Sequence, residues 1–329
     1  WLPRNHEEIA QPPRRLIAAD LHLHRDILSL RTDTEGNLLP ESPTSLDTLL
    51  VSPLAWLLGR IGAEPTPWAP DTLGPLLQGN IAHSVFEQLF PVGGGGVDRE
   101  TVETVVDKAL ADAIRKHAPL LSTAQWKVER HSLRATLIQA VSCWQDVLDS
   151  VDGRVVGVEA RLTGEFNGIP ISGFCDEIIQ LPNGKLVVVD FKKSTSGKRR
   201  ERMELGYDCQ VSLYEMMLGE DGSGLELETS PGRPGIVYFT LNDQRVLADD
   251  RTGLPPDVPG LAVVANDVSG NALRDIEARL KKLRLGVVEM NQEDDAKRLD
   301  KDKGLPGYAL EASPLVMMFA HPSSAEEME

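Results

Sequence analysis

The feature that most constrains the fold of this chain is a hairpin whose two strands are apolar on both faces. The apolar positions on either side of its turn are Ile178, Ile179, Val187, Val188 and Val189. Strands of this kind are typical of the centre of a sheet that is covered on both sides. In the turn, Pro182 supplies the φ angle of a type I turn and Gly184 the left-handed position that closes it. We therefore predict a central antiparallel hairpin with a three-residue loop.

The length of this loop fixes which side chains of the two strands face each other. With a three-residue loop, Asp176 lies directly across from Asp190, on the same face and about 4.5 to 5.5 Å away at Cβ. Lys192 shares that face because it lies two residues further along the strand. A two-residue turn would instead pair Asp176 with Phe191 and place the two carboxylates on opposite faces.

Two carboxylates this close cannot both stay ionised at a buried strand end unless a positive charge compensates them. A divalent cation provides that charge, and Mg²⁺ or Mn²⁺ prefers oxygen ligands with room for water and phosphate. The ammonium of Lys192 could orient an attacking water or stabilise charge that develops on a phosphate. These residues predict metal-assisted phosphodiester hydrolysis. Without the second aspartate, the Asp and Lys would more simply form a solvated strand end or an ion pair.

Helical and strand periodicities place this hairpin in an α/β chain. We predict helices near residues 45–58, 72–90, 99–117, 123–148, 202–218 and 272–289. Strands are predicted over residues 155–166, 169–180, 185–191 and 236–241, and the first three form an antiparallel meander. Loops are predicted over the Gly- or Pro-containing stretches 219–235 and 249–260. We expect a lead-in or linker over residues 1–43, one domain over 44–291, and a disordered or docking tail over 292–329.

Composition limits the classes of protein to which the chain can belong. Lys plus Arg number 34 and Asp plus Glu number 50, which gives a formal charge of −16. This argues against a protein that coats nucleic acid by bulk charge, although binding follows the local field of a groove. No apolar run approaches the roughly 18 residues of a membrane span, so we expect no membrane partner. Three cysteines are too few for a disulfide framework and fit a reducing, cytoplasmic compartment.

The order and spacing of four motifs resemble the PD-(D/E)XK nuclease superfamily, and within it the RecB/AddB-type exonuclease domains and the CRISPR-adaptation nucleases. The motifs are Gly79-x-x-x-His83, Gly173-x-x-Asp176, Asp190-x-Lys192 and Gln210-x-x-x-Tyr214. Upstream, Ser45-Leu46-Asp47 and Ser52-Pro53-Leu54-Ala55-Trp56 are similar to the family's N-terminal helix. The resemblance runs from Ser45 to Leu241. It implies a restriction-endonuclease-like core, in which helices flank a central mixed sheet, with a helical N-terminal region.

The resemblance also implies roles for individual residues. It implies that His83, Asp176 and Asp190 hold Mg²⁺ or Mn²⁺, with the main-chain carbonyl of Phe191 as a further ligand. Lys192 would then be the catalytic lysine of a DNA phosphodiesterase. This implies a metal-dependent deoxyribonuclease, and the relatives suggest the exonuclease domain of a helicase–nuclease that acts in DNA repair and recombination.

Three further residues have weaker assignments. Gln210 and Tyr214 lie one turn apart on a predicted helix, where they would contact the scissile strand or brace the lysine. The alternative for this pair is an ordinary amphipathic helix. Glu159 occupies a strand position that helps the site in some relatives, and a structural ion pair is an equal alternative. Several relatives hold an iron–sulfur cluster, but no cysteine follows Cys209, so we expect no cluster and a buried packing role for Cys175 and Cys209.

Basic residues gather where the chain leaves the predicted catalytic strand. Six Lys or Arg residues lie between Lys192 and Arg202, in a stretch that we predict to be a loop. Those expected to contact DNA phosphates are Lys193, Lys198, Arg199 and Arg200. A solvated loop without a DNA contact is the alternative. The substrate would be single-stranded DNA or duplex ends.

The chain contains no motor motif of its own. Gly184-Lys185 and Gly197-Lys198 are its only Gly-Lys pairs, and neither fits a P-loop. We therefore expect any helicase to be a partner subunit or an upstream domain. The chain begins at Trp1 rather than at methionine, which suggests a piece of a longer protein.

Two rival functions remain open. Asp20-Leu21-His22-Leu23-His24 resembles the opening strand of PHP-type metal phosphoesterases, which need further histidines on later strands. The alternative for this segment is a structural exposed strand. A nuclease-like module that only binds DNA or a partner is the second rival, but such modules usually lose the acids or the lysine, and here both are present.

Overall fold

The computed structural model describes residues 20–63, 73–94, 96–219, 232–265, 267–291 and 295–305. The chain divides into two compact units. The larger unit comprises Leu38–Asp47 and Pro67–Arg274, and the smaller comprises Trp1–Asn37, Thr48–Thr66 and Asp275–Glu329. Every residue predicted for the site belongs to the larger unit.

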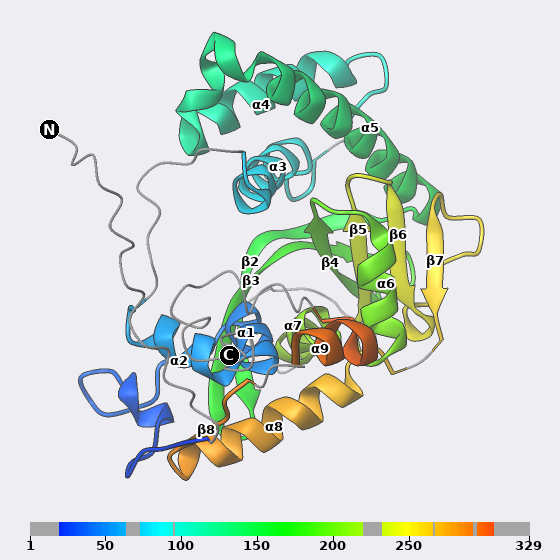
Figure 1. The fold of residues 1–329 in the computed structure, drawn as a ribbon. Coiled ribbons are helices and arrows are strands. Elements are labelled where there is room, and N and C mark those ends of the chain that lie inside the picture. The colour runs from blue at the N-terminus through cyan, green and yellow to red at the C-terminus, as the bar shows by residue number, and fades with distance from the viewer. Residues whose placement is uncertain are drawn as a thin grey trace, which may run out of the picture. The chain divides into compact units, whose positions relative to one another are not determined.

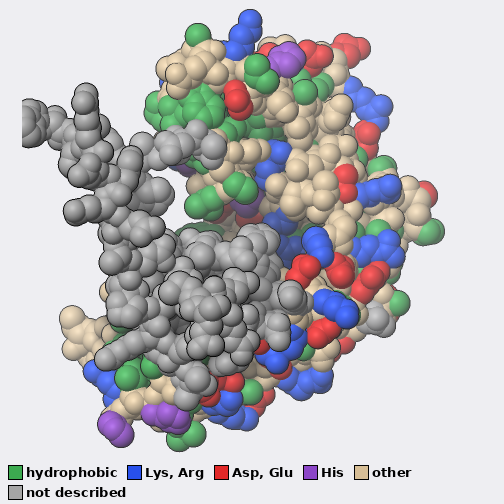
Figure 2. Space-filling view, viewed as in Figure 1, with side chains coloured by type: hydrophobic (Ala, Val, Ile, Leu, Met, Phe, Trp, Pro, Cys, Tyr) green, Lys and Arg blue, Asp and Glu red, His purple; other side chains and the backbone are tan. Residues whose placement is uncertain are grey.

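The surface carries charges of both signs. On the face shown in Figure 2, Lys and Arg side chains are interspersed with Asp and Glu rather than gathered into one basic patch. With 50 acidic against 34 basic residues, a polyanionic ligand must find its favourable potential locally.

A six-stranded mixed sheet forms the centre of the larger unit, with strand order β2-β3-β4-β5-β6-β7 (Figure 1). The strands are β2 (Arg154–Phe166), β3 (Ile169–Gln180), β4 (Leu186–Lys192), β5 (Gly235–Thr240), β6 (Arg245–Asp249) and β7 (Leu261–Val264). Strands β2, β3 and β4 form an antiparallel meander, β4 pairs in parallel with β5, β5 is antiparallel to β6, and β6 is parallel to β7. The predicted α/β fold with a mixed central sheet and a meander is confirmed.

The predicted register of the hairpin is also confirmed. Glu177 pairs with Val189 and Ile178 with Val188, as a three-residue loop requires. Gly184 has a φ of +81°, in the left-handed region where a side chain is costly. The turn chemistry of Pro182-Asn183-Gly184 therefore places Asp176 and Asp190 at equivalent positions of adjacent strands.

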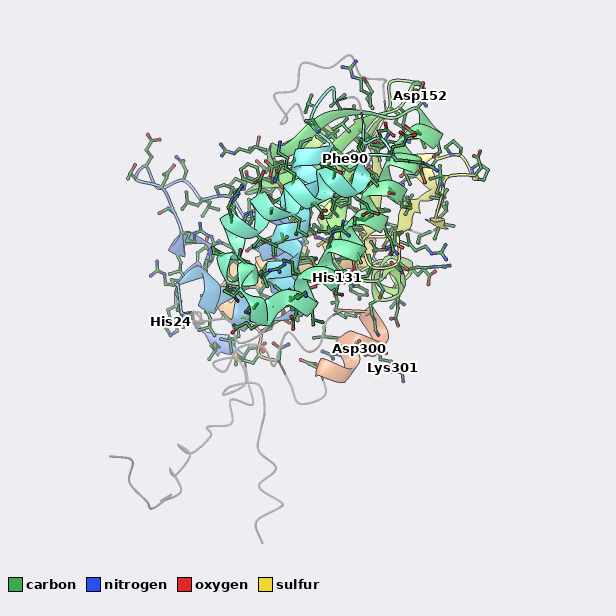
Figure 3. All side chains as sticks on the ribbon, turned by 90° about the horizontal axis from the view of Figure 1, so that it is seen from above. His24, Phe90, His131, Asp152, Asp300 and Lys301 are labelled. Carbon is green, nitrogen blue, oxygen red and sulfur yellow. The ribbon has the colours of Figure 1, made fainter. Side chains whose placement is uncertain are left out.

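Three helices cover one face of this sheet. They are α3 (Pro75–Leu89), α4 (Val102–His117) and α5 (Lys127–Val151), which lie together on one side in Figure 1. Their apolar side chains share one buried cluster with Val187, Val189 and Phe191 of β4. Phe90 ends α3 and Asp152, with a left-handed φ of 47°, turns the chain from α5 into β2 (Figure 3).

Two short helices follow β4 in place of the single helix predicted near 202–218. They are α6 (Ser196–Glu204) and α7 (Gln210–Gly219). The break follows from Gly206, whose φ is +72°, and from Asp208, which is fully buried and holds Arg199 at 2.6 Å. Part of the basic stretch predicted as a loop is therefore helical. Helix α7 packs against β2, β3, β4 and β5.

Two strands of the sheet were not predicted. Strand β6 and strand β7 flank the proline-containing stretch 249–260, which itself is mainly loop with one short 3-10 helix. They are five and four residues long. Segments this short show too little periodicity to be recognised, and their strand structure depends on pairing with neighbours, of β6 with β5 and of β7 with β6.

The smaller unit contains short elements. They are β1 (Leu21–His22), the 3-10 helix η1 (Leu28–Leu30), α2 (Pro53–Arg60), β8 (Val287–Val288) and α9 (Asp295–Lys303). Helices α1 (Pro43–Val51) and α8 (Gly270–Arg284) each contribute residues to both units. The predicted N-terminal helix is confirmed as α1 and α2, which are separated at Ser52, whose hydroxyl accepts a hydrogen bond from Ala55 N.

One prediction near the C-terminal end needs correction. The helix predicted near 272–289 ends at Arg284, and β8 follows and pairs with β1. The segment predicted to be a disordered or docking tail contains helix α9, in which Lys303 forms an ion pair of 2.6 Å with Asp275. Residues 1–19 of the predicted lead-in and 306–329 of the predicted tail lie outside the described residues. None of the described helices is long and apolar enough to span a membrane.

Candidate active site

The candidate site lies where β3 and β4 separate. Their pairing ends at Glu177 and Val189, so the next main-chain groups of β4 need other partners. The N–H of Phe191 donates to Asp176 Oδ2 at 2.7 Å, and the carbonyl of Phe191 lies 2.7 Å from Nε2 of His83 on α3. The end of the β3–β4 pairing thus brings the Asp176 carboxylate, the His83 imidazole and the Phe191 carbonyl together.

His83 bridges the two partners of Phe191. Its Nε2 can only donate to the Phe191 carbonyl, while its Nδ1 lies 3.3 Å from Asp176 Oδ1. Burial alone would lower the pKa of His83, but the hydrogen bond and charge of Asp176 and the charge of Asp190 outweigh it and raise the pKa to about 9. In the metal-free protein, His83 is therefore an imidazolium that donates from both nitrogens.

Asp190 and Lys192 form the second part of the site. The Asp190 side chain is 2% exposed, and its Oδ2 lies 2.6 Å from Lys192 Nζ. Burial and the neighbouring charge of Asp176 raise the pKa of Asp190, Lys192 opposes them, and the result is a pKa of about 6. The charge of Asp176 thus acts on Asp190, which the predicted register places opposite it.

Glu159 completes the acidic group. The pairs Val158–Glu177 and Ala160–Cys175 flank it in β2, so it sits opposite Asp176. Its φ of 45° is left-handed, a conformation that non-glycine residues rarely adopt and that is often found at functional sites. Burial, followed by the charge of Asp176, raises the pKa of Glu159. The position of Glu159 beside Asp176 is compatible with a role in the site, and that role stays a prediction.

These residues fit a divalent cation. Ligand atoms of His83, Glu159 and Asp176 all lie within 4.8 Å of one another. Around an octahedral ion with bonds of about 2.1 Å, adjacent ligands are about 3 Å apart and opposite ligands about 4.2 Å. The 3.3 Å between His83 Nδ1 and Asp176 Oδ1 is close to the shorter separation, whereas the 2.7 Å contact with the Phe191 carbonyl is made by the other ring nitrogen, Nε2. Carboxylate and carbonyl oxygens suit Mg²⁺ and Mn²⁺. Without a metal ion, the protonated His83 supplies the positive charge beside these acids.

Among the described residues, the group of potential ligands does not include the predicted ligand Asp190, whose Oδ2 lies 2.6 Å from Lys192 Nζ. Its assignment as a metal ligand stays a prediction, as does that of the Phe191 carbonyl.

Tyr214 and Gln210 of α7 approach the site from the face opposite to α3. The Tyr214 hydroxyl is hydrogen-bonded to the Gln210 side chain, and burial with the charges of Asp190 and Asp176 raises the pKa of Tyr214. A Cβ on Gly173 would lie 2.8 Å from Tyr214 Cε1. The glycine of the Gly173-x-x-Asp176 motif is therefore required by the close approach of the tyrosine ring.

The four predicted DNA contacts have different surroundings. Lys198 and Arg200 project from α6 with side chains 68% and 53% exposed, each beside a glutamate of the same helix. Lys193 donates to Asn242 Oδ1. Arg199 needs correction as a surface contact, because it is paired with buried Asp208 and stacks at 4.5 Å on the ring of Tyr238.

Three residues near the candidate metal ligands were not predicted from the sequence. Glu177 is buried and accepts a hydrogen bond from Trp144 Nε1, and burial raises the pKa of Glu177 to about 8. Strand alternation could have identified it, since its neighbours place it on the core face. Lys116 and His117 end α4 and line a hollow of about 550 Å³ with His83, Glu159 and Asp176. No local pattern marks these two, because they belong to an ordinary helix end.

The rival metal-site segment gains no support. His22 pairs in the two-residue strand β1, and the Asp20 carboxylate accepts a hydrogen bond from Met290 N. Neither His22 nor His24 belongs to a group of potential ligands among the residues that the structure describes. Cys175 and Cys209 are buried, as predicted for packing residues.

Comparison with known proteins identifies the family of this chain. The family model for the PD-(D/E)XK nuclease superfamily matches residues 40–301. Eight chains of solved structures match, among them a crystal structure from Eubacterium rectale described as a "putative exonuclease", with 11% identity and a TM-score of 0.42 over 76% of this chain and 83% of that chain. A search of curated proteins finds no match. Because the family model spans most of the sequence and every residue of the site, the chain belongs to the PD-(D/E)XK nuclease superfamily.

Proposed function

We propose that this chain is a divalent-metal-dependent deoxyribonuclease that hydrolyses phosphodiester bonds from DNA ends. The observation that carries the proposal is the opening between β3 and β4. It joins Asp176, His83 and the Phe191 carbonyl to the Asp190–Lys192 pair within one end of the sheet. Membership of a nuclease superfamily supports hydrolysis, and the intact acids and lysine argue against a module that only binds.

The metal would be held by His83, Glu159 and Asp176, with Asp190 and the Phe191 carbonyl beside them. Bound there, Mg²⁺ or Mn²⁺ would supply Lewis-acid stabilisation of the scissile phosphate and lower the pKa of a water. The acids neutralise its charge, and the Phe191 backbone fixes the position of Asp176. Because the set includes an imidazole, we expect Mn²⁺ to support activity at least as well as Mg²⁺.

Lys192 would act as a hydrogen-bond donor, which a metal ion cannot do. Its Nζ is anchored at 2.6 Å by Asp190, so its ammonium is held in place without occupying a coordination position. From there it can donate to a phosphate oxygen or to the attacking water. Tyr214 and Gln210 limit the space on the α7 side and brace this arrangement.

Lys116 and His117 extend the site toward the substrate. They line the same hollow as His83 and Asp176, and His117 Nε2 has no hydrogen-bond partner within the described part of the chain. A cation and an unpaired imidazole facing the acidic group are suited to a phosphate oxygen of the neighbouring nucleotide. Lys116 offers a local positive charge in a chain of charge −16.

The biological setting is part of the same proposal. The resemblance to RecB/AddB-type domains supports an exonuclease that works in DNA repair and recombination beside a helicase subunit or domain. The absence of a P-loop from the sequence is consistent with a separate motor.

The proposal is tested with end-labelled linear and circular DNA, single-stranded and duplex, incubated with Mg²⁺, Mn²⁺ or EDTA. We expect shortening of linear substrates only, and only with a divalent ion. Asp190→Asn and Lys192→Met should each lower the cleavage rate about a hundredfold or more. Asp146→Asn, which removes a partly buried carboxylate of α5 that pairs with Arg99 outside the site, is the matched control and should cleave normally.

Unchanged cleavage by Asp190→Asn would remove this residue from the mechanism. DNA binding without cleavage under every metal condition would instead favour the nuclease-like binding module. Equal cleavage of circular and linear DNA would replace the exonuclease with an endonuclease.

A further inference from the structure

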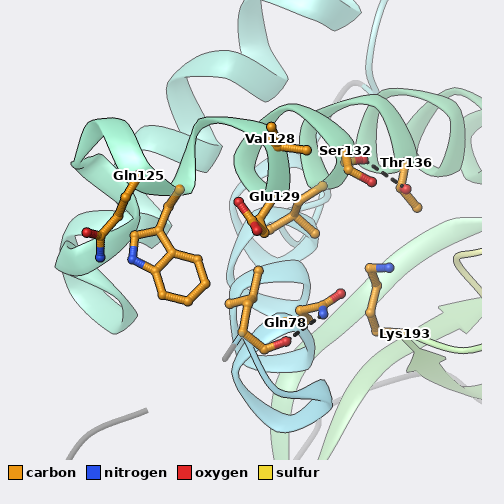
Figure 4. Close-up of a pocket in the computed structure, with 10 residues that line it drawn as sticks. Gln78, Gln125, Val128, Glu129, Ser132, Thr136 and Lys193 are labelled. Atoms are coloured by element: carbon orange, nitrogen blue, oxygen red, sulfur yellow. Dashed lines mark hydrogen bonds between the residues drawn. The ribbon is translucent and has the colours of Figure 1, made fainter. Parts of the chain in front are cut away.

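A second hollow lies in the larger unit and contains none of the potential metal ligands. Its volume is about 650 Å³, within the range of small-molecule sites, and it is framed by the start of α3, the start of α5 and the residue after β4 (Figure 4). We propose that this hollow is a nucleobase-binding site that seats one unpaired base of the DNA substrate. The proposal rests on the proposed nuclease function and adds a binding site to it.

The lining has the chemistry of a base pocket. Trp126 and Leu133 provide apolar surface, and Gln78 and Gln125 provide amide groups. Lys193 and Glu129 contribute one charge of each sign, and Figure 4 shows both on the rim of the same space. A nucleobase is flat and neutral, with donors and acceptors on its edge, so such a mixed lining suits it better than a purely ionic ligand.

Trp126 is the residue that points most directly to a ligand. It lies in the 3-10 helix η3 (Ala124–Trp126) and is partly buried against the core of α3, α4 and α5. Its indole Nε1 is buried and has no acceptor among the residues that the structure describes. A buried N–H without a partner is uncommon in native proteins. The ring would offer its face for base stacking, and the N–H, which lies in the plane of the ring, would find its acceptor in a sugar or phosphate oxygen of the strand and not in the stacked base.

Lys193 links this hollow to the candidate active site. It directly follows Lys192, and successive residues of an extended chain point to opposite sides. Lys192 therefore faces Asp190, while Lys193 reaches the second hollow. One strand end thus presents a cation to the scissile phosphate and a second cation to the base pocket. A DNA strand cleaved at the metal group would pass Lys193 with a neighbouring nucleotide.

The pocket selects unpaired bases. In a duplex, the faces and edges of each base are occupied by stacking and pairing, so entry would require the nucleotide to leave the helix. A single strand pays far less for the same contact, and base–aromatic stacking tolerates every base. The site would therefore favour single strands or frayed ends without sequence preference.

The test measures the affinity of the full chain for a fluorescein-labelled 12-mer of oligodeoxythymidylate in EDTA at low salt. We expect Trp126→Ala to lower this affinity about tenfold, the loss typical of one stacked base. Trp126→Phe keeps an aromatic face and should stay within about threefold of the parent protein. Leu76→Ala removes an apolar side chain that is 79% exposed on α3 and does not line the hollow, so it should leave the affinity unchanged.

An oligonucleotide of the same length with abasic sugars separates base contacts from phosphate contacts. The parent protein should bind it about tenfold more weakly than oligodeoxythymidylate, whereas Trp126→Ala should barely distinguish the two. Blunt duplex DNA should be bound equally by both proteins. Equal effects of Trp126→Ala on the abasic strand and the normal strand would overturn the base pocket.

Two further measurements keep the outcome unambiguous. If Trp126→Ala does not fold, Gln125→Ala and Lys193→Met replace it, because their loss leaves the apolar core intact; normal binding by both would overturn the proposal. Hydrolysis of bis(p-nitrophenyl) phosphate with Mn²⁺ reports the metal site without any base. Its absence from the parent protein would count against the nuclease function, whereas its persistence in Trp126→Ala, together with weaker oligonucleotide binding, supports the pocket.

Discussion

Phe191 joins the core to the candidate active site within one residue. Its ring packs 4.4 Å from that of Phe86 and 5.3 Å from that of Trp144, measured between centroids. Its main-chain N–H and carbonyl contact Asp176 and His83. Because close-packed rings allow little movement, the packed Phe191 ring also restricts the main-chain groups that contact Asp176 and His83. Two site contacts therefore depend on backbone held by packing and not on surface rotamers.

His83 makes metal binding depend on pH. Its pKa is raised to about 9 by Asp176 and Asp190 despite burial, so the ring carries a proton throughout the neutral range. A metal ligand must be neutral imidazole, and that proton must leave when the ion binds. We expect the affinity for Mn²⁺ to rise about tenfold per pH unit below about pH 9 and to level off above it.

Titration calorimetry at pH 7.5, in two buffers that differ in ionisation enthalpy, measures this directly. The parent protein should release about one proton for each ion bound, and His83→Gln should release markedly less while binding more weakly. Proton release that is the same in both proteins would assign the proton to another group.

A glycine in β3 allows a tyrosine of helix α7 to approach the sheet closely. Gly173 lies in β3 where a Cβ would meet Tyr214 Cε1 at 2.8 Å and Pro43 Cδ at 3.0 Å. We predict that Gly173→Ala displaces the Tyr214 ring, lowers the free energy of unfolding by about 1–3 kcal/mol and slows cleavage. The measurements are thermal unfolding and the cleavage rate with saturating metal.

Gly197→Ala is the matched control for this substitution. It lies in α6 with no atom within 4 Å of the added Cβ, and alanine favours a helix over glycine. It should leave cleavage unchanged and stabilise slightly. Normal cleavage and stability in Gly173→Ala would mean that Tyr214 can move freely, and its bracing role would be withdrawn.

Local chemistry made several elements predictable. The turn Pro182-Asn183-Gly184 fixed the register of β3 and β4, because both the φ of proline and the left-handed glycine act within the turn itself. The meander and the helices α3, α4 and α5 followed from periodicity. The sequence-based positions of Asp176, Asp190 and Lys192 on one strand face follow from that register.

Other elements depend on distant partners and were not predictable. The break between α6 and α7 depends on Asp208, whose buried carboxylate meets Arg199 and the hydroxyl of Tyr238 on β5. The same pairing turns Arg199 inward, although its sequence neighbours are exposed. The β3–β4 pairing ends where the candidate metal ligands come together. No local sequence signal marks this point, because the sequence remains strand-like on both sides of it.

The whole chain carries a formal charge of −16, although its proposed substrate, DNA, is also negatively charged. The site adds to this repulsion, since Glu159 and Asp176 line the same hollow as Lys116 and His117, the proposed phosphate contacts. Charges within about 10 Å of the substrate act before salt screens them, whereas distant charges are largely screened at physiological ionic strength. The local acids, more than the net charge, should therefore control DNA binding until a metal neutralises them.

This reasoning predicts that loss of acids strengthens DNA binding without metal. The double variant Glu159→Gln/Asp176→Asn should bind DNA several-fold more tightly than the parent in EDTA, because two nearby repulsions disappear. It should gain little affinity from Mn²⁺, whereas the parent gains much. Glu100→Gln/Asp146→Asn removes the same formal charge from the exposed side of the α4–α5 region and should match the parent in both conditions. Fluorescence anisotropy at low and physiological salt measures all three, and equal gains in both double variants would assign the effect to net charge.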